Sequence, residues 1–499
     1  MKTLLRSLPL AAAGLAFLAW CAPAVAVIQV DFPVSKICEA SKTVLVGTVT
    51  SVNPANRVAD VRVDRAVKGQ AAGKRLRVQV VNPAGLIQHV AAKQRVVVFV
   101  AKVKTAAKAV AIVHLADTWL LAKPIPTAKT PAWRVVETYQ GKQSFPGRTV
   151  ALARIVAEMQ AGKSSLLDKV EHNVFRGGVK ERAKLKVAKP LSLSAADVNG
   201  DKKPDLLVDA AGGSRLFLAT AKGYQDVTKT WCPWGRAGGY SAFGDVNGDG
   251  KVDFLQNGAL WINTGKAFTT ARVALDVPEK SPALAAALMD ATGDGKPDAL
   301  LLAANGELRV FENPGNGAQD WPRQPARSLW KDSAAPLAAT FGDWGDDGKP
   351  HVMVVRSDGV TRYAVRPDGA PATDYEGLTG VGLGKYHQAH RGGLKDVLVT
   401  RIDINADRRS DLFLLAGGHG LLLVNRGFGA YMVNPDAGGA VVSRGRQKVP
   451  FQLTPSTPWT AADLHGDGFE DLLILTPDGT LYEVSNTPFR IGAGVRLRH

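Results

Sequence analysis

The chain has 499 residues, of which 45% are hydrophobic and 21% are charged. The composition is typical of a folded protein and excludes wholesale disorder, and the length favours two or more domains over a single compact core. The net charge of +17 is unevenly distributed, because residues 27–190 hold 28 Lys and Arg against 10 Asp and Glu, whereas residues 191–499 hold 32 against 35. The chain therefore divides into a basic N-terminal region and a slightly acidic C-terminal region.

The first 26 residues have the pattern of a signal peptide. Lys2 and Arg6 precede an apolar run over Leu8–Trp20, and the small residues of Ala24–Ala26 suit cleavage. We expect a secreted or periplasmic protein with no membrane span, because no other segment approaches 18 uninterrupted apolar residues. Only Cys38 and Cys232 would then remain, and we favour two free thiols over a bridge between them.

Residues 27–122 are predicted to form a small β-barrel or sandwich. The segment Cys38-Glu-Ala followed by Val44–Val49 is loosely similar to OB-like barrels of the netrin/TIMP class. Residues 123–189 are expected to be a linker, over Pro124–Pro131, and an amphipathic helix over Thr149–Met159 that ends at Gly162. The expected strands are Thr43–Val49, Val58–Val63, Leu76–Val80, Arg95–Val100 and Ala109–Val113.

Residues 190–499 contain one nine-residue pattern six times. All six copies have Asp at positions 1 and 5, five of them have Gly at position 4 or 6, five have Asp at position 9, and position 3 is Asn in three of them. The first aspartates are separated by 48, 45, 53, 60 and 60 residues, which is the length of one propeller blade. The six loops are residues 197–205, 245–253, 290–298, 343–351, 403–411 and 463–471, called loops one to six below.

This spacing suits Ca²⁺, which takes six to eight oxygen ligands. A tightly wound loop can supply side-chain oxygens from positions 1, 3, 5 and 9 and the backbone carbonyl of position 7, and Gly permits the positive φ that such winding requires. Isolated Asx-turns are the alternative, but a turn needs one such residue rather than three or four. The predicted ligands are Asp197, Asn199, Asp201, Lys203, Asp205, Asp245, Asn247, Asp249, Lys251, Asp253, Asp290, Thr292, Asp294, Lys296, Asp298, Asp343, Asp347, Asp403, Asn405, Asp407, Arg409, Asp411, Asp463, Asp467, Phe469 and Asp471.

An EF-hand is excluded, because it needs an acidic residue at position 12 and flanking helices. Position 12 is apolar or an amide here, and strand-like segments follow each loop, such as Leu300–Leu302 and Leu412–Leu415. Hairpin turns such as Asn305-Gly306 and Asp478-Gly479 come next. The loops with this spacing resemble the FG-GAP (VCBS-type) repeats of integrin α-chain propellers, which implies an all-β, calcium-binding propeller without implying one biochemical function.

Two loops depart from the pattern. Loop four has Gly345 at position 3 and His351 at position 9, so we expect a weak or empty site, and loop six has His465 at position 3. Six loops predict six blades. A seventh could form from Val170–Val187 and the C-terminal segment Val495–Arg498, and we lean towards seven.

Two functions remain open. The first is a non-enzymatic binding protein of the adhesion type that takes a protein or polysaccharide ligand, in which the basic N-terminal domain holds an anionic partner; nucleic acid ranks last because stacking aromatics are sparse. The second is a propeller-type hydrolase or lyase acting on an acidic polysaccharide. We favour the first, because no G-x-S-x-G, H-E-x-x-H or P-loop motif occurs and the pair His387 and His390 has no identifiable third ligand.

Overall fold

The structure is a computed structural model, and a large part of the chain is described in it. The expected signal peptide, Gly162, Asp347 and the pair His387 and His390 lie outside the described residues. No helix in the described part has the length and apolar character needed to cross a membrane. The described residues are 34–102, 109–138, 148–160, 175, 178–232, 240–256, 258–275, 283–315, 321, 325, 327–331, 336–345, 348–366, 369–377, 393–425, 431–434, 441–443, 446–486, 490–491 and 495–496.

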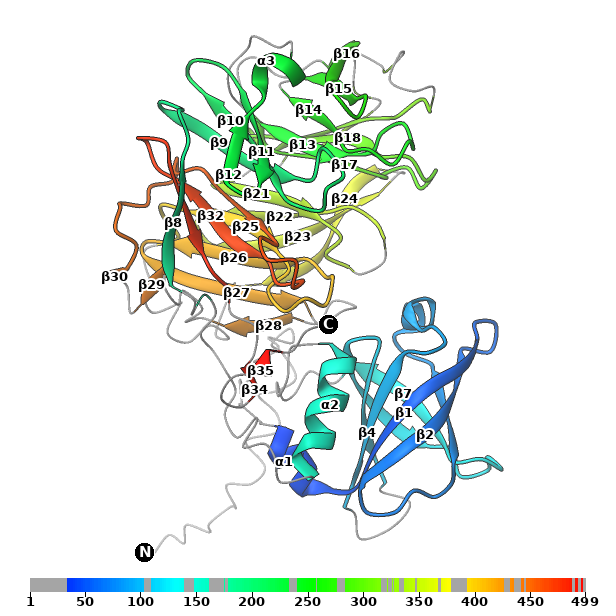
Figure 1. Ribbon diagram of the computed structural model, residues 1–499. Coiled ribbons are helices and arrows are strands. Elements are labelled where there is room, and N and C mark those ends of the chain that lie inside the picture. The colour runs from blue at the N-terminus through cyan, green and yellow to red at the C-terminus, as the bar shows by residue number, and fades with distance from the viewer. Residues whose placement is uncertain are drawn as a thin grey trace, which may run out of the picture.

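The N-terminal region is a closed barrel of seven strands in the order β1-β2-β3-β7-β6-β5-β4. Figure 1 labels β1, β2, β4 and β7 of this barrel. Its helices are α1 (Val34–Ala40), η2 (Ala84–His89) and α2 (Thr149–Gln160). The barrel confirms the barrel alternative but has two more strands than the five expected. The strands are β1 (Ser41–Asn53), β2 (Val58–Lys68), β3 (Arg75–Val80), β4 (Arg95–Ala101), β5 (Ala111–Leu115), β6 (Thr118–Pro124) and β7 (Ala132–Thr138).

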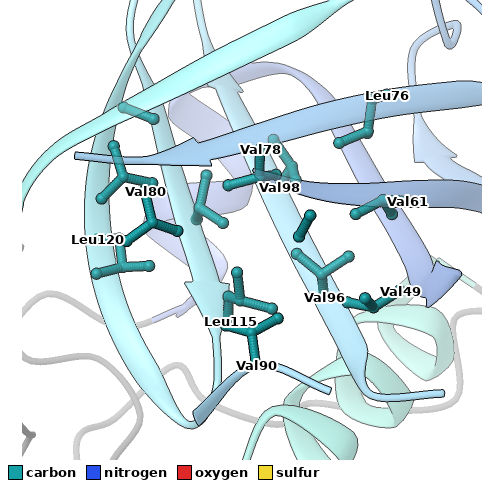
Figure 2. Packing of buried hydrophobic residues seen from close by; sticks show 14 of the residues in the cluster. Val49, Val61, Leu76, Val78, Val80, Val90, Val96, Val98, Leu115 and Leu120 are labelled. Atoms are coloured by element: carbon teal, nitrogen blue, oxygen red, sulfur yellow. The ribbon is translucent and has the colours of Figure 1, made fainter. Parts of the chain in front are cut away.

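Both faces of part of the barrel wall are buried. Inward side chains such as Val49, Val78 and Leu115 fill the interior (Figure 2). Outward side chains such as Val46 and Phe99 pack under α1 and α2. Strands buried on both faces have continuous apolar runs, as in Val44-Leu-Val of β1.

The stretch Pro124–Pro131, which we expected to be a linker, joins β6 to β7 within this barrel. Strand β7 pairs in parallel with β3 and antiparallel with β6, so residues 132–138 complete the barrel rather than leaving it. The predicted helix is present as α2, within a residue or so of its expected end.

Six four-stranded antiparallel sheets follow, and each predicted loop joins the first strand of a sheet to the second. Residue 9 of each loop opens the second strand. Short elements outside the sheets are α3 (Thr228–Trp231), β29 (Val442–Ser443), β30 (Arg446–Gln447), β34 (Arg490–Ile491) and β35 (Val495–Arg496). The sheets are β9 (Pro190–Ala196), β10 (Asp205–Ala210), β11 (Arg215–Thr220) and β12 (Gly223–Asp226); β13 (Ser241–Gly244), β14 (Asp253–Gln256), β15 (Ala259–Asn263) and β16 (Phe268–Ala274); β17 (Ala283–Met289), β18 (Asp298–Ala303), β19 (Glu307–Phe311) and β20 (Arg327–Lys331); β21 (Ala338–Gly342), β22 (His351–Arg356), β23 (Gly359–Arg366) and β24 (Gly369–Gly377); β25 (Leu398–Ile402), β26 (Asp411–Ala416), β27 (His419–Asn425) and β28 (Tyr431–Asn434); and β31 (Trp459–Ala462), β32 (Asp471–Leu475), β33 (Thr480–Val484) and β8 (Val179–Lys184).

The six sheets form a closed ring. Each first strand contacts the first strand of the next sheet, and β31 of the sixth contacts β9 of the first. A hydrophobic cluster fills each gap between neighbouring sheets. The cluster that closes the ring joins Leu206 and Val208 of the first sheet to Leu473 and Leu481 of the sixth.

The seventh blade that we favoured does not occur among the described residues. Strand β8, which lies in the segment expected to help form it, is instead the outer strand of the sixth sheet, paired antiparallel with β33. The C-terminal residues 495–496 pair with residues 490–491 in a separate hairpin. The C-terminal part of the chain supplies only three strands, β31 to β33, to the sixth sheet. Strand β8 pairs with β33 and so covers a sheet edge that would otherwise stay open. The thiols of Cys38 and Cys232 are both free, as expected.

Candidate metal centres

Described loops share one backbone winding. In loop two, Gly248 and Gly250, at positions 4 and 6, have φ of 74° and 80°. The carboxylate of Asp245, at position 1, accepts the N–H groups of Gly248 (2.7 Å), Asp249 (3.1 Å) and Gly250 (2.8 Å). Loops one, five and six repeat most of this arrangement, so position 1 organises the turn around its carboxylate.

Position 9 is the most buried position of the loop. Asp253 accepts the N–H of Val246 at position 2 (3.0 Å) and the N–H of Asn263 at the end of the third strand (2.8 Å). Asp205, Asp298, Asp411 and Asp471 make the same two kinds of contact, and none of the five is more than 1% exposed. Each carboxylate therefore ties its loop to two strands of its sheet.

The charges of positions 5 and 9 differ in their surroundings. Burial raises the pKa of Asp205 and of Asp253 to about 6, although the backbone N–H donors oppose the shift. At position 5, the Lys251 ammonium donates a hydrogen bond that lowers the pKa of Asp249. The position-5 carboxylate of loops one to three therefore has a lysine counter-ion, with Nζ–Oδ2 distances of 3.2, 2.7 and 3.0 Å. The position-9 carboxylate of these loops instead accepts hydrogen bonds from backbone N–H groups.

A set of asparagines that the sequence analysis missed joins neighbouring sheets. Asn263 Nδ2 donates to the carbonyl of Val198 in loop one (2.7 Å), and Asn313 Nδ2 donates to that of Val246 in loop two (2.9 Å). Asn486 likewise reaches Ile404 in loop five (2.8 Å). An Asn at the end of the third strand, 10 to 15 residues after position 9, was the available signal. These asparagines tie each of the three loops to the next sheet of the ring.

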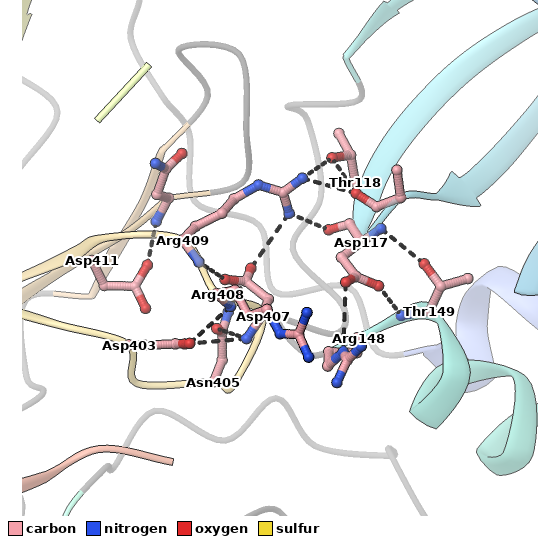
Figure 3. Close-up of polar contacts among 12 residues, drawn as sticks. Asp117, Thr118, Arg148, Thr149, Asp403, Asn405, Asp407, Arg408, Arg409 and Asp411 are labelled. Carbon is pink, nitrogen blue, oxygen red and sulfur yellow. Dashed lines mark hydrogen bonds and ion pairs between the residues drawn. The ribbon is translucent and has the colours of Figure 1, made fainter. Parts of the chain in front are cut away.

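Loop five is more enclosed than loops one to three. Asp403, Asn405, Asp407 and Asp411 are all buried, whereas position 5 of loops one to three is exposed. Burial raises the pKa of Asp403 to about 7 and of Asp407 to about 6. The covering element is the barrel, whose β5–β6 turn lies against the loop (Figure 3).

Loops four and six differ in structure as in sequence. In loop four, Gly348 N–H donates to Asp343 (2.8 Å), and a ring nitrogen of His351 lies 3.0 Å from the carbonyl oxygen of Lys349. In loop six, His465 Nε2 lies 3.0 Å from Glu483 and 3.6 Å from Asp471. Within the described part of the chain, these are the only three His, Cys, Asp or Glu side chains whose ligand atoms lie within 4.8 Å of one another.

The donor set nevertheless fits a hard cation. Carboxylate, amide and carbonyl oxygens are the ligands that Ca²⁺ prefers. In loop three, the buried hydroxyl of Thr292 at position 3 has no hydrogen-bond partner among the described residues. In loops one, two, three and five, the position-1 carboxylate accepts a hydrogen bond from the backbone N–H of position 6. These bonds hold the oxygens of each loop within one turn.

The solved structures to which this chain is similar are distant. An Agrocybe aegerita lectin specific for non-reducing terminal N-acetylglucosamine is 15% identical, with a TM-score of 0.38 over 60% of this chain and 81% of that chain. The BP39L lectin of Burkholderia pseudomallei is 16% identical, with a TM-score of 0.36 over 60% and 84%. A Photorhabdus luminescens Tc holotoxin pore is 14% identical, with a TM-score of 0.39 over 79% and 18%.

No curated protein matches the sequence. Residues 197–255 and 290–354 match the family model of the FG-GAP-like repeat, and these segments include the whole of loops one, two, three and four. The chain therefore contains FG-GAP-like repeats.

Proposed function

We propose that this protein is an exported, calcium-stabilised β-propeller of six blades that acts as a non-enzymatic binding protein. The observation that carries the proposal is the set of buried position-9 carboxylates. In loops one, two, three and five, these aspartates are at most 1% exposed, and among the described residues their hydrogen-bond donors are backbone N–H groups rather than cationic side chains. Buried charge of this kind is stabilised by a bound cation.

Calcium would supply positive charge at each loop and so offset the repulsion between its carboxylates. The loops adjoin the hydrophobic gaps between sheets, since position 2 of each loop packs into them, as Val198 and Val246 do. The asparagine contacts described above extend this order to the next sheet. Calcium would therefore stiffen the ring as a whole and leave its faces free for a ligand.

The thermal stability of the full chain tests the calcium part of the proposal. A cation that binds the folded state alone stabilises it by about 2.7 kcal/mol per site at 100 times Kd. We expect removal of calcium with EDTA to lower the melting temperature by well over 5 °C and excess Ca²⁺ to restore it. A melting curve that is unchanged by EDTA would refute calcium loading.

The basic barrel is the proposed site for an anionic partner. Arg65, Lys74 and Arg75 are exposed at one end of strands β2 and β3. Such clustered charge attracts polyanions, and the attraction weakens with salt. We expect binding of the full chain to pectate or alginate to fall about tenfold when all three are replaced by Ala.

A control with the same loss of charge on the ring separates local from global effects. Replacing the exposed Lys222, Lys229 and Lys266 by Ala should change binding less than twofold. Equal loss in both triple variants would show that net charge alone governs binding. Reproducible turnover of the polysaccharide, abolished by a substitution outside the loops, would instead favour the hydrolase or lyase alternative.

A further inference from the structure

We propose that loop five is the joint that docks the barrel onto the ring, and that cation binding in this loop and docking of the barrel stabilise each other. The inference rests on the proposed calcium binding. It concerns one loop of six, because the described contacts place the barrel against loop five.

Arg409, at position 7 of loop five, makes the contact (Figure 3). Its guanidinium donates hydrogen bonds to the carbonyl of Asp117 (3.0 Å), the carbonyl of Ala116 (2.8 Å) and the hydroxyl of Thr118 (2.9 Å). The same side chain lies 3.5 Å from the carboxylate of Asp407 and is only 6% exposed. One buried arginine thus bridges the loop and the barrel.

The identity of residue 7 explains why this loop differs from loops one to three. There, position 7 is Lys203, Lys251 or Lys296, and each ammonium stays in its own loop on the position-5 carboxylate. A guanidinium has five donors in a planar fork, so Arg409 can keep its contact with Asp407 and still reach three acceptors on the barrel.

The barrel turn that accepts the hydrogen bonds of the Arg409 guanidinium is itself held by contacts within the barrel region. Ala116 and Asp117 form the β5–β6 turn with φ of 46° and 58°. Asp117 accepts the N–H of Thr149 (2.6 Å), and its own N–H donates to the Thr149 hydroxyl (3.0 Å) at the start of α2. Positive φ is costly for residues other than Gly, so these contacts hold a turn that the chain would not favour alone.

Loop five also contains residues other than Gly with positive φ. Ala406 and Arg408, at positions 4 and 6, have φ of 58° and 69°, where loops two, three and six have Gly at both positions. Its carboxylates are also buried, and among the described residues Arg409 is the only cationic side chain within 4 Å of Asp403, Asp407 or Asp411. The loop is therefore wound at a cost that cation binding and docking would both offset.

The two events are coupled through one residue. Position 7 is the position whose backbone carbonyl we expect to face the cation, while its side chain holds the barrel. When the loop is ordered around a cation, the Arg409 guanidinium is therefore positioned for its contacts with the barrel. When these contacts form, they in turn order the loop. By reciprocity, calcium strengthens docking by the same factor as docking strengthens calcium binding at this loop.

The test uses the full chain with and without Ca²⁺. Hydrogen exchange of the peptide spanning residues 111–124 reports the joint, small-angle scattering reports the radius of gyration, and thermal melting reports the ring. We expect chelation of calcium to speed exchange in this peptide about tenfold and to increase the radius of gyration. Arg409→Ala should show fast exchange and the larger radius even in Ca²⁺, whereas Lys222→Ala, which removes an exposed cation of the ring outside the loops, should behave as the parent chain does.

Arg409→Lys is the second variant, because it keeps the charge and loses the fork; it should resemble Arg409→Ala at the joint while keeping the calcium-dependent melting shift. If calcium raises the melting temperature but leaves exchange and radius unchanged, the coupling is refuted and the proposed function stands. If calcium affects none of the three, both are refuted. A docked barrel in Arg409→Ala would also overturn the assignment of the joint.

Discussion

Replacing Asp253 by Asn isolates the role of the buried loop carboxylate. Asp253 is fully buried and accepts the N–H groups of Val246 and Asn263. Asn has nearly the same size but only one acceptor oxygen, so its NH₂ group faces one of these N–H donors. An unsatisfied buried donor costs about 1–3 kcal/mol, and removal of the buried charge offsets part of this cost. Without calcium, the melting temperature should fall by about 4 °C or less.

In calcium the same variant should lose more. It would also lose the stabilisation from one site, about 2.7 kcal/mol at 100 times Kd, or roughly a further 5 °C. Differential scanning calorimetry of both proteins in calcium and in cation-free buffer measures this difference. An equal loss in the two buffers would refute a role for Asp253 in cation binding.

Asp209 offers a matched control. It is fully buried like Asp253, but it lies outside the loops and accepts hydrogen bonds from Ser192 Oγ (2.6 Å), Ser214 Oγ (2.6 Å) and Gln256 Nε2. Asp209→Asn should lower the melting temperature by the same amount in both buffers. A calcium-dependent loss in this variant would show that the comparison reports general damage to the ring.

Three further predictions concern closure, strain and pH. Arg182→Ala removes the ion-pair partner that lies 2.6 Å from the buried Glu483, and it should lower the free energy of unfolding by about 3 kcal/mol in denaturant titrations. Lys184→Ala, on the same strand, should lower it by less than about 1 kcal/mol. Similar losses in the two variants would argue against closure of the ring by Arg182 and Glu483. Arg408→Gly should stabilise the chain by about 1 kcal/mol, since φ is 69°, and a loss would contradict strain there. Burial raises the pKa of Asp205 to about 6, so the cation-free chain gains stability from this group as pH falls from 7 towards 4. The increase in melting temperature that calcium causes should therefore be smaller at pH 5 than at pH 7.5. An increase that does not depend on pH would count against carboxylate ligation.

Much of the ring could be predicted from local sequence, because each sheet repeats the same loop, buried strand and hairpin turn. Residues such as Gly248 and Gly250 mark the winding directly through their positive φ. Ala406 and Arg408 adopt the same winding without Gly, and only the aspartate spacing pointed to it.

Other features depend on contacts between distant segments. Strand β8 joins the sixth sheet through pairing with residues about 300 positions later, as Arg182 with Glu483 illustrates, so its place could not be predicted from the local sequence pattern. Strand β7 follows a proline-rich stretch that indicated a linker. The burial of Asp407 depends on the barrel, whose position relative to the ring has no local signal.

The central claim is that the aspartate loops hold calcium, and a crystal structure of the full chain grown with Ca²⁺, with an anomalous difference map, tests it most directly. The account predicts peaks in loops one, two, three and five, each surrounded by oxygens from positions 1, 3, 5, 7 and 9. Loop four should be weak or empty. A map without peaks in those four loops at millimolar Ca²⁺ would contradict the account.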